Sequence, residues 1–174
     1  MDGLSGARVF AAALCILLGA LIGYRKSQRV ARRAAVLGQL ARGLDLLGQQ
    51  IDCAALELPA ALESTGRILS GEAGSWFSQL GARARQSALA MADLWEQAME
   101  LPPVADLPAG DREPLMHLGP AWAMRRVELV ERLSGAKGQL STLAESARQD
   151  QQKKGRMWQS VGLLIGLMAA VLLL

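Results

Sequence analysis

The fold is decided by residues 28–55, QRVARRAAVLGQLARGLDLLGQQIDCAA, in which apolar residues return every seven positions. The repeat consists of Val30, Leu37, Leu44 and Ile51, with Ala34, Leu40 and Leu47 between them. Such a repeat is typical of a helix that packs nearly parallel to a partner helix along one face. Gly38, Gly43 and Gly48 each cost up to about 1 kcal/mol relative to alanine in a helix, so tertiary packing must stabilise this one.

A second long helix with a matching apolar seam is predicted to open at Gly119-Pro120. Its apolar positions alternate steps of four and three residues: Leu129, Leu133, Ala136, Leu140, Leu143 and Ala147. We therefore predict that the core seam of the domain includes Leu37, Leu44 and Ile51 from the first long helix and Leu133 and Leu140 from the second. Both helices are expected to bury these residues against other helices.

The composition favours an all-α protein. Of the 174 residues, 51% are hydrophobic but only 4% are aromatic, so most of the apolar mass is Ala, Leu and Val. This balance suits helices better than a sheet, which favours β-branched and aromatic residues. The net charge of +3 is too small to indicate a nucleic-acid partner. Most of the excess positive charge lies beside two apolar runs, where a membrane surface explains it better.

Prolines and glycines divide the segment between the long helices. Pro59 predicts a helix that runs to about Leu69 and is ended by Gly71. The segment Pro102–Gly110 holds three prolines and a glycine and is predicted to be a loop. A short helix around Asp111–Leu118 should follow, before Gly119-Pro120 interrupts the chain.

A third helix is predicted from Trp76 to about Glu100, with Ser75 as its N-cap. Its expected buried stripe consists of Phe77, Leu80, Ala84, Ala88, Met91, Trp95 and Ala98. The pair Pro102-Pro103 follows the end of this helix.

Two apolar runs, Val9–Tyr24 and Val161–Leu174, are each bordered by basic residues on the side that faces the middle of the chain. The basic residues are Arg25 and Lys26 after the first run and Lys153, Lys154 and Arg156 before the second, where Trp158 also lies. Basic groups and indole rings prefer the headgroup region of a bilayer, and basic loops stay cytosolic. We predict a short flank at residues 1–8, a transmembrane anchor at residues 9–24, a cytosolic helical domain at residues 25–156 and a transmembrane anchor at residues 157–174.

The first apolar run could also be a cleaved signal peptide, because Arg8 precedes an apolar stretch of suitable length. However, Gly23-Tyr24-Arg25 lacks a small-x-small cleavage site. Five positive charges then follow at once: Arg25, Lys26, Arg29, Arg32 and Arg33. Such a cluster resists translocation, so we predict an uncleaved anchor.

Each predicted anchor also holds two glycines four residues apart. These are Gly19 and Gly23 in the first anchor and Gly162 and Gly166 in the second. This spacing places both glycines on one helix face and allows another backbone to approach closely. We therefore expect the anchors to pack against each other or against other membrane helices.

No constellation of residues indicates catalysis. His117 is the single histidine, and no cysteine or serine lies at a recognisable catalytic spacing from it. Cys15 and Cys53 have neither zinc nor disulfide spacing and are expected to be small buried residues. We predict that the protein is not an enzyme and has no cofactor, metal site or small-molecule substrate.

The C-terminal segment at residues 153–167, KKGRMWQSVGLLIGL, resembles the ending of the stage III sporulation protein AB family of endospore-forming bacteria. Further resemblances to the family are Arg29–Ile51, Leu58-Pro59, Trp76-Phe77-x-x-Leu80 and Leu118-Gly119. The chain departs from the family pattern at Trp122-Ala123, where a second Leu-Gly is expected, and the Asp and Gln that should follow are missing.

The resemblance implies a non-enzymatic membrane platform subunit of a secretion-like complex between mother cell and forespore. The soluble part of the family is similar to the cytoplasmic helical domain of the type II secretion platform protein. Implied partners are other membrane subunits of the sporulation complex, a cytosolic secretion-type ATPase and the lipid bilayer. The implied location is the mother-cell side membrane around the forespore, with the central domain in the cytosol. The alternative is a membrane-anchored helical signalling or adaptor protein.

Overall fold

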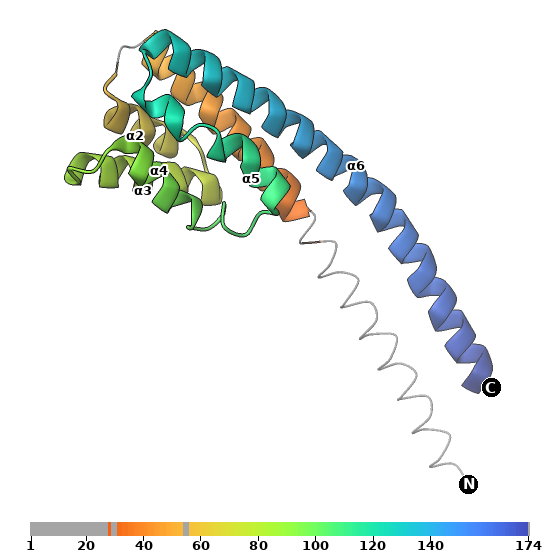
Figure 1. Ribbon diagram of the computed structural model, residues 1–174. Coiled ribbons are helices and arrows are strands. Elements are labelled where there is room, and N and C mark those ends of the chain that lie inside the picture. Colours follow the sequence, from red (N-terminus) through yellow and green to blue (C-terminus); the bar gives the residue numbers. More distant parts are fainter. Residues whose placement is uncertain (1–27, 29–30, 54–55, 174) are drawn as a thin grey trace. The chain divides into compact units, whose positions relative to one another are not determined.

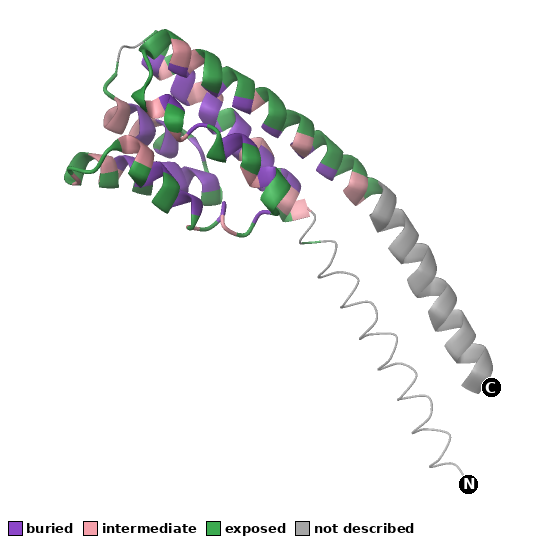
Figure 2. Cartoon of the chain, in the orientation of Figure 1, coloured by how far each residue is buried: buried purple, intermediate pink, exposed green. Residues whose placement is uncertain are grey.

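The computed structural model describes residue 28, residues 31–53 and residues 56–173, and it describes side chains up to residue 152. All secondary structure in this part of the chain is helical, which confirms the predicted all-α class. Arg33–Glu145 form one compact unit, and the packing described below lies within it. Figure 1 shows the helices of this unit, and Figure 2 shows which of their residues are buried.

The core of the unit is built on two long helices that run side by side (Figure 1). The first covers residues 31–52, and the second is α6, Arg126–Leu173, of which the residues up to Glu145 belong to this unit. An ion pair joins them, with Lys137 Nζ 2.7 Å from Asp45 Oδ1. On the first helix the apolar repeat is buried throughout its described length: Ala34, Leu37, Leu40, Leu44, Leu47 and Ile51. On α6 the buried positions include Leu129, Leu133, Ala136 and Leu140, whereas Leu143 is half-buried.

Three glycines allow helices α2, Leu58–Ile68, and α3, Gly71–Gln86, to pack very closely. A Cβ atom at Gly66 would lie 2.5 Å from the backbone nitrogen of Ser78 on α3. A Cβ at Gly81 would lie 2.7 Å from the backbone nitrogen of Glu63 on α2, and one at Gly74 would clash with the carbonyl oxygen of Leu69. Any larger side chain at these positions would therefore push the two backbones apart.

Gly66→Ala is expected to lower the free energy of unfolding by about 1–3 kcal/mol, because the added methyl group overpacks a contact with backbone atoms that cannot move independently. Gly135→Ala is the matched control, because no described atom outside the backbone of its own helix lies within 4 Å of its added Cβ. The control should instead be stabilised by up to about 1 kcal/mol through higher helix propensity. Denaturant unfolding of both variants measures the difference, and equal effects would show that the α2–α3 contact is loose.

The boundary between α2 and α3 differs from the prediction. Gly71 does not end α2, which stops at Ile68, but is the first residue of α3 with a φ of 84°. A positive φ is unstrained only for a residue without a Cβ, so glycine is needed where the chain turns into α3. Ser70 occupies the N-cap position, and the predicted cap Ser75 lies inside the helix, where its Oγ donates to the carbonyl oxygen of Gly71.

The predicted single helix from Trp76 to Glu100 is wrong, because the structure divides it into α3 and α4, Met91–Met99. In the break, the Leu89 amide donates to Ser87 Oγ at 3.1 Å. Such local serine bonds compete with helical backbone pairing. The break divides the expected stripe into three groups: Phe77, Leu80, Trp95 and Ala98 are buried, Ala84 and Met91 are half-buried, and Ala88 is exposed.

The predicted loop and short helix are confirmed with small shifts. Helix α5 covers Ala109–Met116 and holds Pro114, after an irregular segment at residues 101–108. Gly119-Pro120 interrupts the chain as predicted, but it opens the 3₁₀ helix η1, Pro120–Ala123, and α6 itself begins at Arg126.

The described backbone of α6 continues to Leu173 without a break. The residues predicted as the first anchor, 9–24, lie outside the described part of the chain, as do the side chains of residues 153–174. A search of the described residues finds no helix with the length and apolar character needed to cross a membrane.

Candidate functional site

The structure places the sequence-predicted residues in two groups. It buries all five seam leucines and isoleucines within the helical unit: Leu37, Leu44, Ile51, Leu133 and Leu140. The predicted packing glycines and interface residues have no described side chains: Gly19, Gly23, Arg25, Lys26, Lys153, Lys154, Arg156, Trp158, Gly162 and Gly166. The candidate site described next was not predicted from the sequence.

An ion pair fixes α5 to the first long helix. Arg33 donates through Nε to Asp111 Oδ2 at 2.6 Å and through a terminal nitrogen to Asp111 Oδ1 at 2.8 Å. The Asp111 side chain is only 3% exposed and that of Arg33 is 32% exposed. The sequence interpretation assigned Arg33 to the basic cluster beside the first anchor, whereas the structure uses it inside the domain. A bidentate pair of this kind holds both partners in a defined orientation.

A chain of aromatic rings links α3, α4 and η1. The rings of Trp76 and Trp95 meet edge to face with centroids 5.3 Å apart, and those of Trp95 and Trp122 lie 4.8 Å apart. Trp76 Nε1 donates to the carbonyl oxygen of Ala98, and Trp95 Nε1 donates to that of Leu115, both at 2.8 Å. These contacts fold α4 back onto α3 and fix its position against α5. Trp122 thus packs against the core of the domain.

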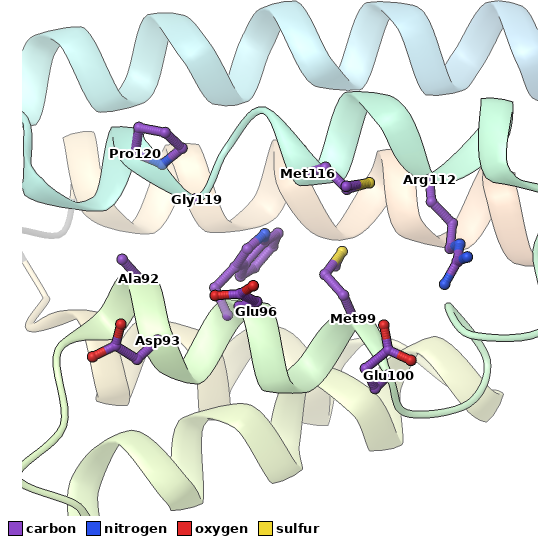
Figure 3. A pocket seen from close by; sticks show the side chains of 10 residues that line it. Ala92, Asp93, Glu96, Met99, Glu100, Arg112, Met116, Gly119 and Pro120 are labelled. Atoms are coloured by element: carbon purple, nitrogen blue, oxygen red, sulfur yellow. The ribbon is translucent and has the colours of Figure 1, made fainter.

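A groove of about 450 Å³ lies between α4, α5 and the turn at Gly119-Pro120 (Figure 3). Its apolar lining consists of Ala92, Trp95, Met99, Met116 and Pro120. Met99 from α4 and Met116 from α5 project into the space between the two helices (Figure 3). The Met116 side chain is conspicuous, because this residue is 61% exposed despite its apolar character. Exposed apolar groups that line a concavity are typical of binding surfaces.

The charged residues of the groove are unevenly distributed. Asp93, Glu96 and Glu100 line it from α4, and Arg112 lines it from α5. Within the described residues, none of the three carboxylates has a hydrogen bond or an ion pair, and Arg112 Nε is buried without a partner. The groove therefore offers an apolar floor and, along one wall, three acidic groups that have no partner among the described residues.

The remaining candidates for chemistry lie apart from the groove lining. His117 is on the surface, with Nε2 3.7 Å from a carboxylate oxygen of Glu113, and both side chains are more than two-thirds exposed. Cys53 is exposed, which corrects the expectation that it is buried. Over the described residues, no three His, Cys, Asp or Glu side chains lie close enough to hold a metal ion. The groove is suited to binding another molecule through apolar contact and charge.

Comparison with known proteins identifies the family. Residues 8–174 match the family model described as Stage III sporulation protein AB (spore_III_AB). A solved structure described as Stage III sporulation protein AB (SpoIIIAB) shares the fold, with a TM-score of 0.63 and 21% sequence identity over 70% of this chain and 98% of that chain. No curated protein sequence matches the chain. The resemblance seen in the sequence is confirmed, and the chain belongs to the stage III sporulation protein AB family, with a role in sporulation.

Proposed function

We propose that the protein is a non-enzymatic platform subunit of a secretion-like sporulation complex. Its helical domain would lie in the mother-cell cytosol and dock partner proteins, while its two terminal segments anchor it in the membrane around the forespore. The partners in this proposal are other membrane subunits of the complex and a cytosolic secretion-type ATPase.

The continuity of α6 is the observation that supports this proposal best. The same helix that buries Leu133 and Leu140 in the domain runs on to Leu173, through the basic residues at 153–156 and into a wholly apolar sequence. A helix with that order of residues suits a domain attached directly to a bilayer, with its basic residues at the cytosolic surface. The described backbone of α6 is helical over this whole stretch, which supports a direct connection between the proposed docking domain and the proposed anchor.

The experiment is a topology map of the full chain in the native cell. A phosphatase reporter fused after Leu174 should be active, because this reporter works only outside the cytosol. A fluorescent protein inserted in the loop at residues 102–108 should fold and fluoresce in the cytosol. Replacing Lys153, Lys154 and Arg156 by glutamine should weaken this orientation, because basic residues near a membrane helix hold their side in the cytosol.

Partner docking is read separately, by co-purification of the tagged full chain with the cytosolic ATPase and the membrane subunits. A phosphatase reporter that is inactive after Leu174 at native charge would contradict the two-anchor topology. Correct topology without any co-purified subunit would contradict the platform role.

A further inference from the structure

We propose that the groove between α4 and α5 binds a cationic amphipathic segment of a partner protein. Such a segment would lay an apolar stripe on the groove floor and bring Lys or Arg side chains to the acidic wall. The assignment rests on the proposed function, because a platform subunit needs a surface at which its partner docks.

The floor of the groove suits apolar side chains. Met99 and Met116 face it from opposite helices (Figure 3), and Ala92 and Trp95 are the other apolar residues that line it from α4. Methionine side chains are flexible and polarisable, so they adapt to the uneven surface of a docked helix. Trp95 is 1% exposed and held by its bond to Leu115, which gives the floor a rigid base.

The charge of the groove selects the partner. Asp93, Glu96 and Glu100 follow one another at steps of three and four residues, so they lie on one face of α4. Their carboxylates have no cationic partner among the described residues, and all three residues are exposed. A cationic segment would be attracted to this wall, whereas nucleic acid and anionic lipid headgroups would be repelled. Charge complementarity therefore favours a basic protein segment.

Arg112 provides an internal check, because it is the one basic residue among the described residues that line the groove. It enters from α5, opposite the acidic wall, and its Nε has no partner within the described residues. If the occupant is cationic, Arg112 opposes its binding, and removal of this charge should strengthen the complex.

The test uses the full chain in nanodiscs of zwitterionic lipid and a fluorescently labelled amphipathic helix of leucine and lysine as the probe. Fluorescence anisotropy gives its Kd, with empty nanodiscs as the blank. Glu96→Lys with Glu100→Lys is expected to weaken binding about tenfold or more, because two attractive charges become repulsive. The matched control, Asp52→Lys with Glu131→Lys, makes the same charge change at exposed sites that do not line the groove and should stay within about twofold.

Two further variants change the groove without reversing charge. Met116→Ser should weaken binding about tenfold through lost apolar contact, while Met124→Ser, at an exposed methionine that does not line the groove, should have little effect. Arg112→Gln should strengthen binding about threefold, a gain that misfolding cannot produce. A leucine–glutamate helix should bind more weakly than the leucine–lysine helix.

Equal binding by the parent chain and the Glu96/Glu100 variant would overturn the proposal, as would a preference for the leucine–glutamate helix. Self-association of the chain that is lost in the same variant would overturn the assignment to a partner and point to a second copy. These outcomes are independent of the topology map and of the co-purification. A result that contradicts binding at the groove can therefore be distinguished from one that contradicts the platform role.

Discussion

Arg33→Met is expected to destabilise the helical domain by about 3 kcal/mol or more, because it leaves the carboxylate of Asp111 buried without its guanidinium. That carboxylate is 3% exposed and accepts two hydrogen bonds from Arg33. The free energy of unfolding, measured with a chemical denaturant, gives the loss. Arg33→Lys should fall between the parent and the methionine variant, since lysine keeps the charge but cannot form the bidentate contact.

The double variant Arg33→Met with Asp111→Leu is the decisive control. With both charges removed, no buried ion is left unpaired, and apolar side chains can fill the space at little cost. Most of the lost stability should return. If the double variant is as unstable as Arg33→Met alone, the loss comes from packing of the arginine stem, and the ion pair contributes little to the free energy of unfolding.

Leu44→Ala and Leu140→Ala should each lower the free energy of unfolding by about 2–5 kcal/mol, because each removes most of a fully buried side chain. Both leucines are 0% exposed, one on each long helix. Leu89→Ala is the control, since Leu89 is 52% exposed and its truncation should change stability by about 0.5 kcal/mol or less. Losses below about 1 kcal/mol at both buried sites would show that the apolar faces of the two long helices contribute little to the stability of the core.

The long helices and the loop could be predicted because their signals are local. The seven-residue repeat from Leu37 to Ile51 places every member on one helix face. An apolar helix face is buried in the folded protein, whichever element packs against it. The prolines at 59 and 102–103 mark boundaries because each lacks the backbone N–H that a helix interior needs and has a fixed φ. Element bounds at these points agree with the structure to within about two residues.

The break between α3 and α4 was missed because no proline or glycine marks it. Residues 87–90 are Ser-Ala-Leu-Ala, which a helix would tolerate. The chain turns there because tertiary contacts, led by Trp76 bonding to Ala98, are made only when α4 folds back. The role of Arg33 was also missed because it depends on a tertiary contact: its partner Asp111 is 78 residues away in the sequence.

The groove lay beyond sequence reasoning because its two walls come from separate helices. The acidic residues of α4 resemble an ordinary solvated helix face, and Met116 resembles a core residue. Only the fold shows that this methionine is exposed beside three carboxylates that have no partner among the described residues. The spacing of Asp93, Glu96 and Glu100 was the one available signal, and by itself it indicates a helix surface and no partner.

The pairing of the first long helix with α6 has a consequence for the order in which the newborn chain folds. Asp45 and Lys137 are separated by 92 residues, whereas α2 and α3 follow each other directly. Neighbouring helices close first, because a short loop loses less entropy, and α2–α3 can cover the first helix where Gly43 meets Phe77. Its contact with α6 waits until the ribosome has released that helix. During translation, part of a leucine-rich surface therefore stays uncovered until nearly the whole domain has been made, and a chaperone has its best opportunity to bind there.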